Sequence, residues 1–205
     1  MKGLLLKDWY MMKKDCRYNL IMALIFAVCG MFAKSLFWVV WPQVVVALLP
    51  TTLIGLEEQA GWHLYADAMP YSRKTLVSEK YLLVLLLTLA VSLILVLGYG
   101  LSGAIQALGI TILDLLSICV VVGLLAPSFM LPMTFKWGMV KGRIAYIICL
   151  ALIGGLGGVM GSMAEEGVLN ISSINLFNLA VFAGSLVLFA ISWMLSIRFY
   201  EKREL

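Results

Sequence analysis

The sequence has little charge for its length. Of its 205 residues, 13% are Asp, Glu, Lys or Arg and 63% are hydrophobic. A soluble domain carries roughly 25% charged residues, so an ordinary globular domain is excluded. Apolar runs of about 20 residues recur along the chain, and each is long enough to cross a bilayer. This pattern predicts an all-α membrane protein with several spans.

Groups that carry chemistry are also scarce. His63 is the one histidine, and the four cysteines show no paired spacing, so no metal site is predicted. The pair Glu57–Glu58 suggests the EExxxR motif of an intramembrane protease, but Trp62 stands where that motif has Arg. No GxxxxGK[ST] motif occurs, so the chain has no P-loop to cradle a nucleotide phosphate. We therefore expect no catalytic residue and no cofactor bound by this chain.

Six apolar blocks predict six transmembrane helices, at 19–36, 38–56, 81–100, 112–132, 144–163 and 175–197. Residues 1–18 form a separate segment that is too polar to span. On a helix, Leu5, Trp9 and Met12 fall on one side, and Lys7 falls opposite. This pattern is typical of an amphipathic helix in the membrane interface, although a basic tail that only anchors the topology is the alternative. Residues 19–205 then form a single six-span domain.

The basic residues predict the orientation. With both termini in the cytoplasm, the outer face keeps only Lys34, and 14 of the 15 Lys and Arg residues lie inside: Lys2, Lys7, Lys13, Lys14, Arg17, Arg73, Lys74, Lys80, Lys136, Lys141, Arg143, Arg198, Lys202 and Arg203. Such a bias is a strong positive-inside signal. The net charge of +4 follows from it and is no footprint of nucleic-acid binding.

No ionisable residue lies near the middle of any predicted span, which disfavours a proton- or ion-coupled carrier. Small residues and prolines punctuate the spans instead. In the fifth span, two overlapping glycine pairs allow close helix packing, within the subunit or across a dimer: Gly154 with Gly158, and Gly157 with Gly161. Four prolines in the second and fourth spans predict bends: Pro42, Pro50, Pro127 and Pro132.

The interval 57–80, EEQAGWHLYADAMPYSRKTLVSEK, is the one long polar stretch of the chain. Its pattern is a helical segment, a break at Met69–Pro70 and a second segment that runs into the third span. This cytoplasmic loop is longer than a simple connection needs. We therefore interpret it as a coupling loop that docks a separate soluble subunit, with interfacial aromatics and positive-inside residues as the alternative.

Two segments resemble the membrane subunits of ABC type-2 exporters, in the branch of small bacterial six-span permeases. The opening MKGLLLKDWY is similar to that family's N-terminal interfacial helix, and WHLYADAMPYSRKTLVSEKYL is similar to its coupling loop. The pair His63–Leu64 departs from the more polar pair expected after the tryptophan. Some members of this branch are similar to exporters of phenol-soluble modulins, which are amphipathic peptides.

The resemblance implies that this chain acts together with partner proteins. A cytoplasmic P-loop ATPase would hold ATP and Mg²⁺, and a second permease subunit would complete a homodimer or heterodimer in the bacterial plasma membrane. Trp62, Tyr65 and Met69 would form an apolar plug in the ATPase. Charged residues would fix its register: Glu57, Glu58, Asp67, Arg73 and Lys74. Membrane lipid is a further partner, and nucleic acid is not.

The resemblance and the uncharged spans together suggest that the cargo is hydrophobic or amphipathic, and in particular a peptide. Two alternatives stay open at this point. One is an ATP-independent membrane carrier, and the other is a non-transporting immunity or anchor protein that binds its cargo.

Overall fold

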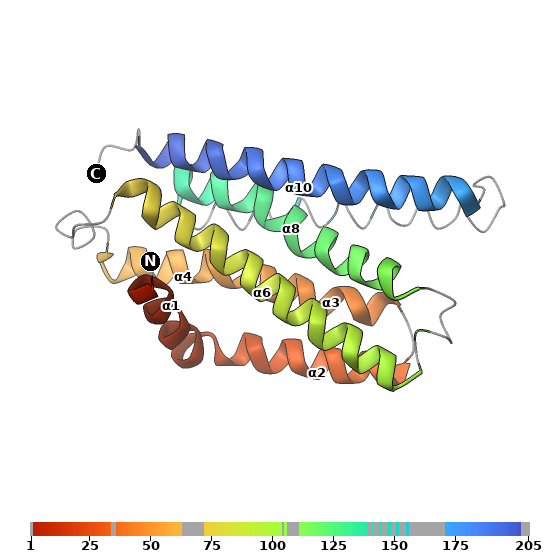
Figure 1. Cartoon of the computed structure of the whole chain (residues 1–205). Coiled ribbons are helices and arrows are strands. Elements are labelled where there is room, and N and C mark those ends of the chain that lie inside the picture. Colours follow the sequence, from red (N-terminus) through yellow and green to blue (C-terminus); the bar gives the residue numbers. More distant parts are fainter. Residues whose placement is uncertain are drawn as a thin grey trace.

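The computed structural model of the chain describes residues 2–33, 36–62, 72–103, 105, 111–138 and 171–201, with isolated residues 141, 144, 147, 148, 151 and 155 (Figure 1). This part of the chain contains helices and no strand, which confirms the all-α prediction there. The helices are α1 (Lys2–Asp15), α2 (Arg17–Ala33), α3 (Leu36–Ala47), α4 (Leu49–Gln59), α6 (Arg73–Leu101), α8 (Ile112–Trp137) and α10 (Ile171–Glu201).

Four described helical stretches are long and apolar enough to cross a membrane: Val40–Gln59, Arg73–Leu101, Ile112–Trp137 and Leu179–Glu201. They overlap the predicted second, third, fourth and sixth spans. The apolar helix α2 covers most of the first predicted span and is shorter. The fifth, 144–163, lies almost entirely outside the described residues, as do Gly154, Gly157, Gly158 and Gly161. The count of six therefore stays a prediction.

The second span is two helices, since α3 ends at Ala47 and α4 begins at Leu49. Pro50 explains the break, because it has no N–H to continue the helical ladder. At the break, the Leu48 carbonyl accepts from both the Thr52 N–H at 3.1 Å and the Thr52 hydroxyl at 3.0 Å. By contrast, Pro42 and the two prolines of α8 lie inside helices that continue past them.

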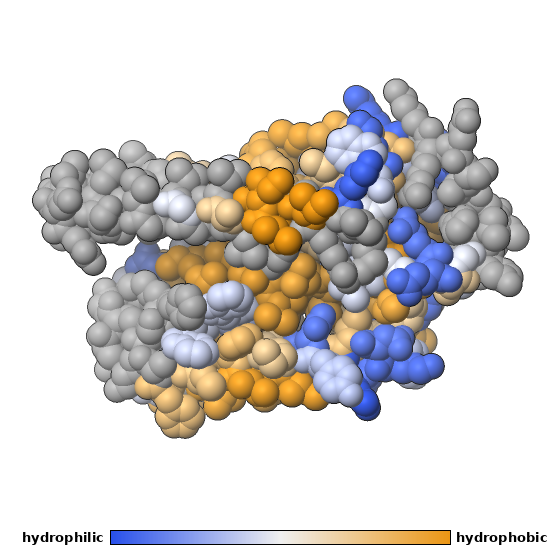
Figure 2. All heavy atoms as spheres, turned by 180° about the vertical axis from the view of Figure 1, so that it is seen from behind, coloured by the Kyte–Doolittle hydropathy of each residue, from blue (hydrophilic) through white to orange (hydrophobic). Residues whose placement is uncertain are grey.

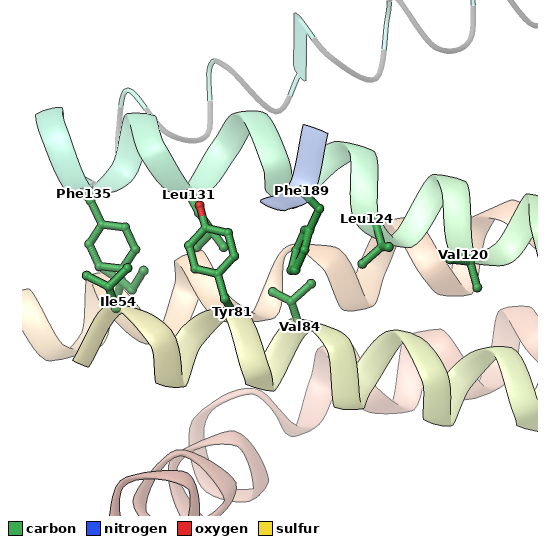
Figure 3. Close-up of a cluster of buried hydrophobic side chains, with 9 residues drawn as sticks. Ile54, Tyr81, Val84, Val120, Leu124, Leu131, Phe135 and Phe189 are labelled. Atoms are coloured by element: carbon green, nitrogen blue, oxygen red, sulfur yellow. The ribbon is translucent and has the colours of Figure 1, made fainter. Parts of the chain in front are cut away.

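The helices pack into a bundle in which α10 lies along α8 and α6, and α2 lies along α3 (Figure 1). Buried side chains from α4, α6, α8 and α10 meet in one core cluster, where Tyr81 packs edge-on against Phe189 (Figure 3). Seen from behind, hydrophobic residues cover the middle of the bundle (Figure 2). Outward apolar side chains on α6 and α10 suit a lipid-facing surface: Leu86, Leu89, Leu93, Leu97, Val187, Ile191 and Met194.

Three polar side chains, those of Gln43, Thr88 and Ser92, lie buried between α3, α6 and α8. Together with Gly123, we call these residues the polar node. Gln43 Nε2 donates to Ser92 Oγ at 2.8 Å, and the Ser92 hydroxyl donates to the Thr88 carbonyl at 2.7 Å. A Cβ atom on Gly123 would collide with the Thr88 side chain and lie 3.1 Å from Gln43 Oε1. Glycine therefore permits the close approach of α8 to α6 and α3.

One end of the bundle gathers α1, the end of α4, the start of α6 and the ends of α8 and α10, and we call it the basic end (Figure 1). Ser72 caps α6 there, since its side chain accepts a hydrogen bond from the Thr75 N–H at 3.3 Å. Gly61 has a φ of +65°, which ends α4 and turns the chain. The stretch 63–71, which includes His63, lies outside the described residues between these two points.

Candidate functional site

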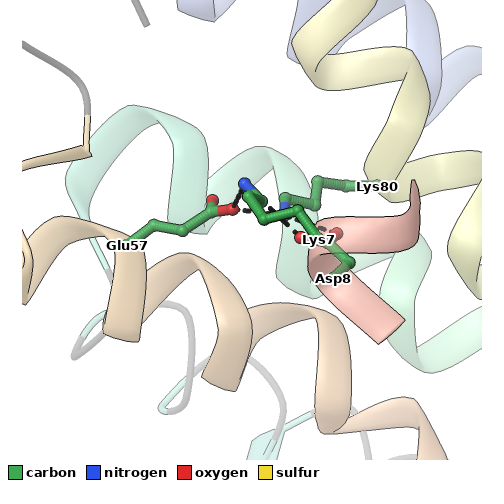
Figure 4. Close-up of polar contacts among 4 residues, drawn as sticks. All are labelled: Lys7, Asp8, Glu57 and Lys80. Carbon is green, nitrogen blue, oxygen red and sulfur yellow. Dashed lines mark hydrogen bonds and ion pairs between the residues drawn. The ribbon is translucent and has the colours of Figure 1, made fainter. Parts of the chain in front are cut away.

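Five ionisable side chains from α1, α4 and α6 meet at the basic end, and we call them the charged junction: Lys7, Asp8, Glu57, Glu79 and Lys80. Figure 4 shows four of them pointing toward one another. Asp8, Glu79 and Lys80 are 0%, 2% and 3% exposed. Charged residues are almost never buried this far unless they are paired, so this junction is the most unusual feature of the described bundle.

Lys80 of α6 bridges the other two helices. Its Nζ donates to Asp8 Oδ2 of α1 at 2.7 Å and to Glu57 Oε1 of α4 at 2.8 Å. Lys7 Nζ also donates to Glu57 Oε1 and lies 3.5 Å from Asp8 Oδ1. These charge-assisted bonds join three helix ends through two ammonium groups. A displacement of any one helix end must therefore strain or break contacts with the other two.

The spacing of α1 explains how its acid reaches the interior. Leu4, Asp8 and Met12 recur every four residues and form the buried stripe of the helix. The buried side of α1 differs from the apolar side that the sequence predicted. Met12 is buried and Leu5 is half-buried, but Trp9 is 46% exposed. Lys7, which we expected on the solvent side, is half-buried in the junction. The interfacial position of α1 stays a prediction.

Cys16 follows α1 at the bend into α2, and its side chain is buried. Burial raises the pKa of the Cys16 thiol, and the nearby Asp15 carboxylate raises it further. The thiol therefore stays protonated at neutral pH and reacts slowly with alkylating reagents. Its labelling rate reports whether α1 stays docked.

Trp62 connects the junction to the undescribed stretch of the predicted coupling loop. Lys7 Nζ lies 4.3 Å from the centroid of the Trp62 ring, a cation–π contact that follows directly after the turn at Gly61. Tyr65, Asp67 and Met69 lie outside the described residues. Lys7 thus touches both Glu57 and the residue that leads into the stretch 63–71.

The remaining predicted coupling residues lie apart from the junction. Glu58 is half-buried, and its Oε2 atom would lie 3.6 Å from a Cβ atom on Gly138, at the end of α8. Arg73 is half-buried at the start of α6. Lys74 pairs with Glu201 of α10 across 3.6 Å and is largely exposed. Glu57 pairs with Lys7 and Lys80 within the bundle, and its predicted contact with a partner stays a prediction.

A second set of contacts ties the start of α6 to α10. The Tyr81 hydroxyl lies 2.7 Å from the hydroxyls of both Ser192 and Ser196, and its ring stacks on Trp193. Trp193 Nε1 donates to Ser78 Oγ at 3.1 Å. The start of α6 is therefore held on one side by charges and on the other by an aromatic contact.

Sequence reasoning missed Lys7, Asp8, Glu79 and Lys80 as site residues. A signal was present: Asp8 and Glu79 are acidic residues in segments whose other charges are mostly basic, and Asp8 lies on an apolar four-residue stripe. Their pairing joins positions 8, 57 and 80, so it arises only in the folded bundle. Among the described residues, no group of three or more acidic, His or Cys side chains is placed to hold a metal ion.

The long apolar helices are those of a multi-pass membrane protein. The chain matches the family model described as "ABC-2 family transporter protein" over residues 3–201 and belongs to that family. It is a membrane-spanning permease subunit of an ABC transporter. Among curated proteins and solved structures, none matches the chain.

Proposed function

We propose that this permease exports hydrophobic or amphipathic cargo, in particular peptides, across the bacterial plasma membrane. A separate P-loop ATPase binds ATP and Mg²⁺ and drives the cycle, and a second permease subunit completes the pathway. The basic end faces the cytoplasm, and so do both termini. The family membership supports the transport class, and the positive-inside bias supports the orientation.

The charged junction is the observation that carries this proposal. The stretch 63–71 lies outside the described residues, between Trp62, which contacts Lys7 of the junction, and Ser72, which precedes α6. Lys7 contacts Trp62 on one side, and Lys80 lies two turns into α6 on the other. An ATPase that binds the stretch 63–71 would displace α4 and α6 together. The ion pair of Lys80 with Asp8 would then displace α1 as well.

The predicted docking residues divide between two roles. Trp62, Tyr65 and Met69 remain the proposed apolar plug, with Glu58, Asp67, Arg73 and Lys74 as charges around it. Glu57 acts within the permease, because its carboxylate accepts from Lys7 and Lys80. Its task is to pass the movement on and not to select the partner.

The cargo assignment depends on the absence of charge in the spans. No Asp, Glu, Lys, Arg or His lies near the middle of a predicted span. The buried polar side chains described at mid-bundle are neutral, as in the polar node. Such walls suit apolar or amphipathic molecules and offer no group that binds a proton or an ion for coupled transport.

The test replaces two plug residues, Trp62→Ala with Met69→Asp, and measures ATPase binding in detergent. We expect binding to be lost while membrane insertion is retained, because truncating a buried aromatic anchor at an interface costs about 2 kcal/mol or more. Trp137→Ala at the same end of the bundle serves as the control and should bind normally. Unchanged affinity in the double variant would show that the loop is not the docking site.

Transport by the purified chain alone, driven by an ion gradient, would instead support a carrier. Tight cargo binding without any transport or ATPase would support an immunity or anchor protein. The two results are distinguished by reconstituting the protein in liposomes with and without a gradient.

A further inference from the structure

The charged junction contains one negative charge too many. Asp8, Glu57 and Glu79 contribute three carboxylates, whereas Lys7 and Lys80 contribute two ammonium groups. Three of these five residues are almost fully buried, and the Glu57 side chain is 13% exposed. An uncompensated buried charge is costly, so a site of this kind gains or loses a proton to become neutral.

Two buried carboxyl oxygens of the junction have no hydrogen-bond partner. They are Asp8 Oδ1 and Glu79 Oε1, although Lys7 Nζ lies 3.5 Å from Asp8 Oδ1. The Asp8 carboxylate lies close enough to Glu79 to disfavour its ionisation. Two carboxylates in contact repel each other unless a proton lies between them.

We propose that Glu79 is a proton-binding site and is held as a neutral carboxylic acid that donates a hydrogen bond to Asp8. A single proton then balances the charges of the junction, two against two, and supplies the missing partner of the Asp8 carboxylate. A metal ion fits less well, since no described group of acidic side chains is placed to hold one. The proposal concerns the permease alone and does not depend on the ATPase.

The proton makes the docking of α1 sensitive to pH. The charged groups that act on Glu79 are Lys80 of its own helix and Asp8 and Lys7 of α1, while Glu57 of α4 acts on Lys80. When Glu79 loses its proton, it repels Asp8, and the two ammonium groups cannot balance three carboxylates. Because the folded state holds the proton more tightly than the unfolded state, the contribution of Glu79 to stability is complete only at acidic pH, below the ordinary pKa of a glutamic acid, and falls as the pH rises.

The test compares the same substitution at two carboxylates of the junction. Glu79→Gln keeps a neutral hydrogen-bond donor beside Asp8 and takes up no proton on folding, so its melting temperature should match that of the wild type at acidic pH and exceed it at neutral pH. The fall of stability that the wild type shows with rising pH should be smaller in Glu79→Gln. Glu57→Gln keeps an acceptor oxygen but removes the negative charge that faces both lysines, so it should lower the melting temperature at every pH at which a carboxylate is ionised.

Infrared spectroscopy of the wild-type protein provides a readout that does not depend on a variant folding. A protonated carboxyl group has a carbonyl-stretch band that a carboxylate lacks. We expect such a band at neutral pH, its loss as the pH rises, and its absence in Glu79→Gln.

Two outcomes would overturn the proposal. If Glu79→Gln destabilises the protein as much as Glu57→Gln and the band is absent from the wild type, Glu79 is ionised and held by other partners. If replacing Na⁺ and K⁺ by choline at constant ionic strength lowers the melting temperature of the wild type but not of Glu79→Gln, the bound cation is a metal ion and not a proton.

Discussion

The charged junction and the polar node each tie three helices together, and they do so by different chemistry. The junction joins α1, α4 and α6 through ion pairs at the basic end. The node joins α3, α6 and α8 through neutral hydrogen bonds and the close approach at Gly123. Because α6 belongs to both, one continuous helix connects the basic end to mid-bundle.

The two regions should respond differently to force and to mutation. Removing one partner of a buried ion pair leaves an uncompensated charge and costs about 3–5 kcal/mol. A hydrogen bond between transmembrane helices contributes only about 0.6 kcal/mol on average and at most about 2 kcal/mol. We therefore expect the charged junction to hold its three helices firmly, whereas the weaker hydrogen bonds of the polar node allow the helices to shift relative to one another.

The largest effect is expected for Lys80→Met, which keeps the side-chain volume but leaves the carboxylates of Asp8 and Glu57 with Lys7 as the remaining cation of the junction. Unfolding in mixed detergent micelles should show a loss of about 3–5 kcal/mol. The matched control is Lys74→Met, whose exposed pair with Glu201 should contribute at most about 1 kcal/mol.

The same variant should free α1. In a background where the other cysteines are replaced by alanine, Cys16 of Lys80→Met should react with maleimide faster than Cys16 of the unmodified junction. Equal labelling rates, together with equal stability of the two lysine variants, would show that the junction contributes no more than a surface ion pair.

A middle-sized effect is expected at the node for Gly123→Ala. The added methyl group collides with the Thr88 side chain, and such overpacking costs about 1–3 kcal/mol. Thr88→Ser removes the methyl group that is struck, so the double variant should recover most of the stability. Gly100→Ala in α6 meets no atom within 4 Å and should have almost no effect. Lack of recovery in the double variant would place α8 elsewhere relative to α6.

The smallest effect is expected for Gln43→Leu, which removes the hydrogen bond to Ser92. We expect a loss of about 0.6 kcal/mol, because Ser92 keeps its own bond to the Thr88 carbonyl. Unfolding measurements alongside Lys80→Met give the contrast directly. If Gln43→Leu costs as much stability as Lys80→Met, the charged junction and the polar node do not differ in strength as proposed.

Local patterns predicted much of the fold. Apolar run lengths indicated the four long described helices, and Pro50 indicated the break in the second span. The segment that contains Ser72, Arg73 and Lys74 was interpreted by its resemblance to a coupling loop. The structure adds a structural role for it, because Ser72 caps α6. Such features depend on residues close together in the chain, which is why sequence alone reveals them.

The charged junction could not be predicted in the same way. Whether Lys80 is a positive-inside marker or a buried cation depends on Asp8, which is 72 residues away in the chain. Likewise, the bonds that the Glu57 carboxylate accepts from Lys7 and Lys80 join distant parts of the chain, and its predicted contact with a partner stays a prediction. Tyr65, Asp67 and Met69 remain predictions because they lie outside the described residues.

The most direct test of the central claim is affinity purification of this chain from native membranes in mild detergent, with mass spectrometry of the copurifying proteins. We predict a near-stoichiometric P-loop ATPase, together with a second permease if the complex is a heterodimer. Recovery of the chain without any ATPase across several detergents would contradict the account.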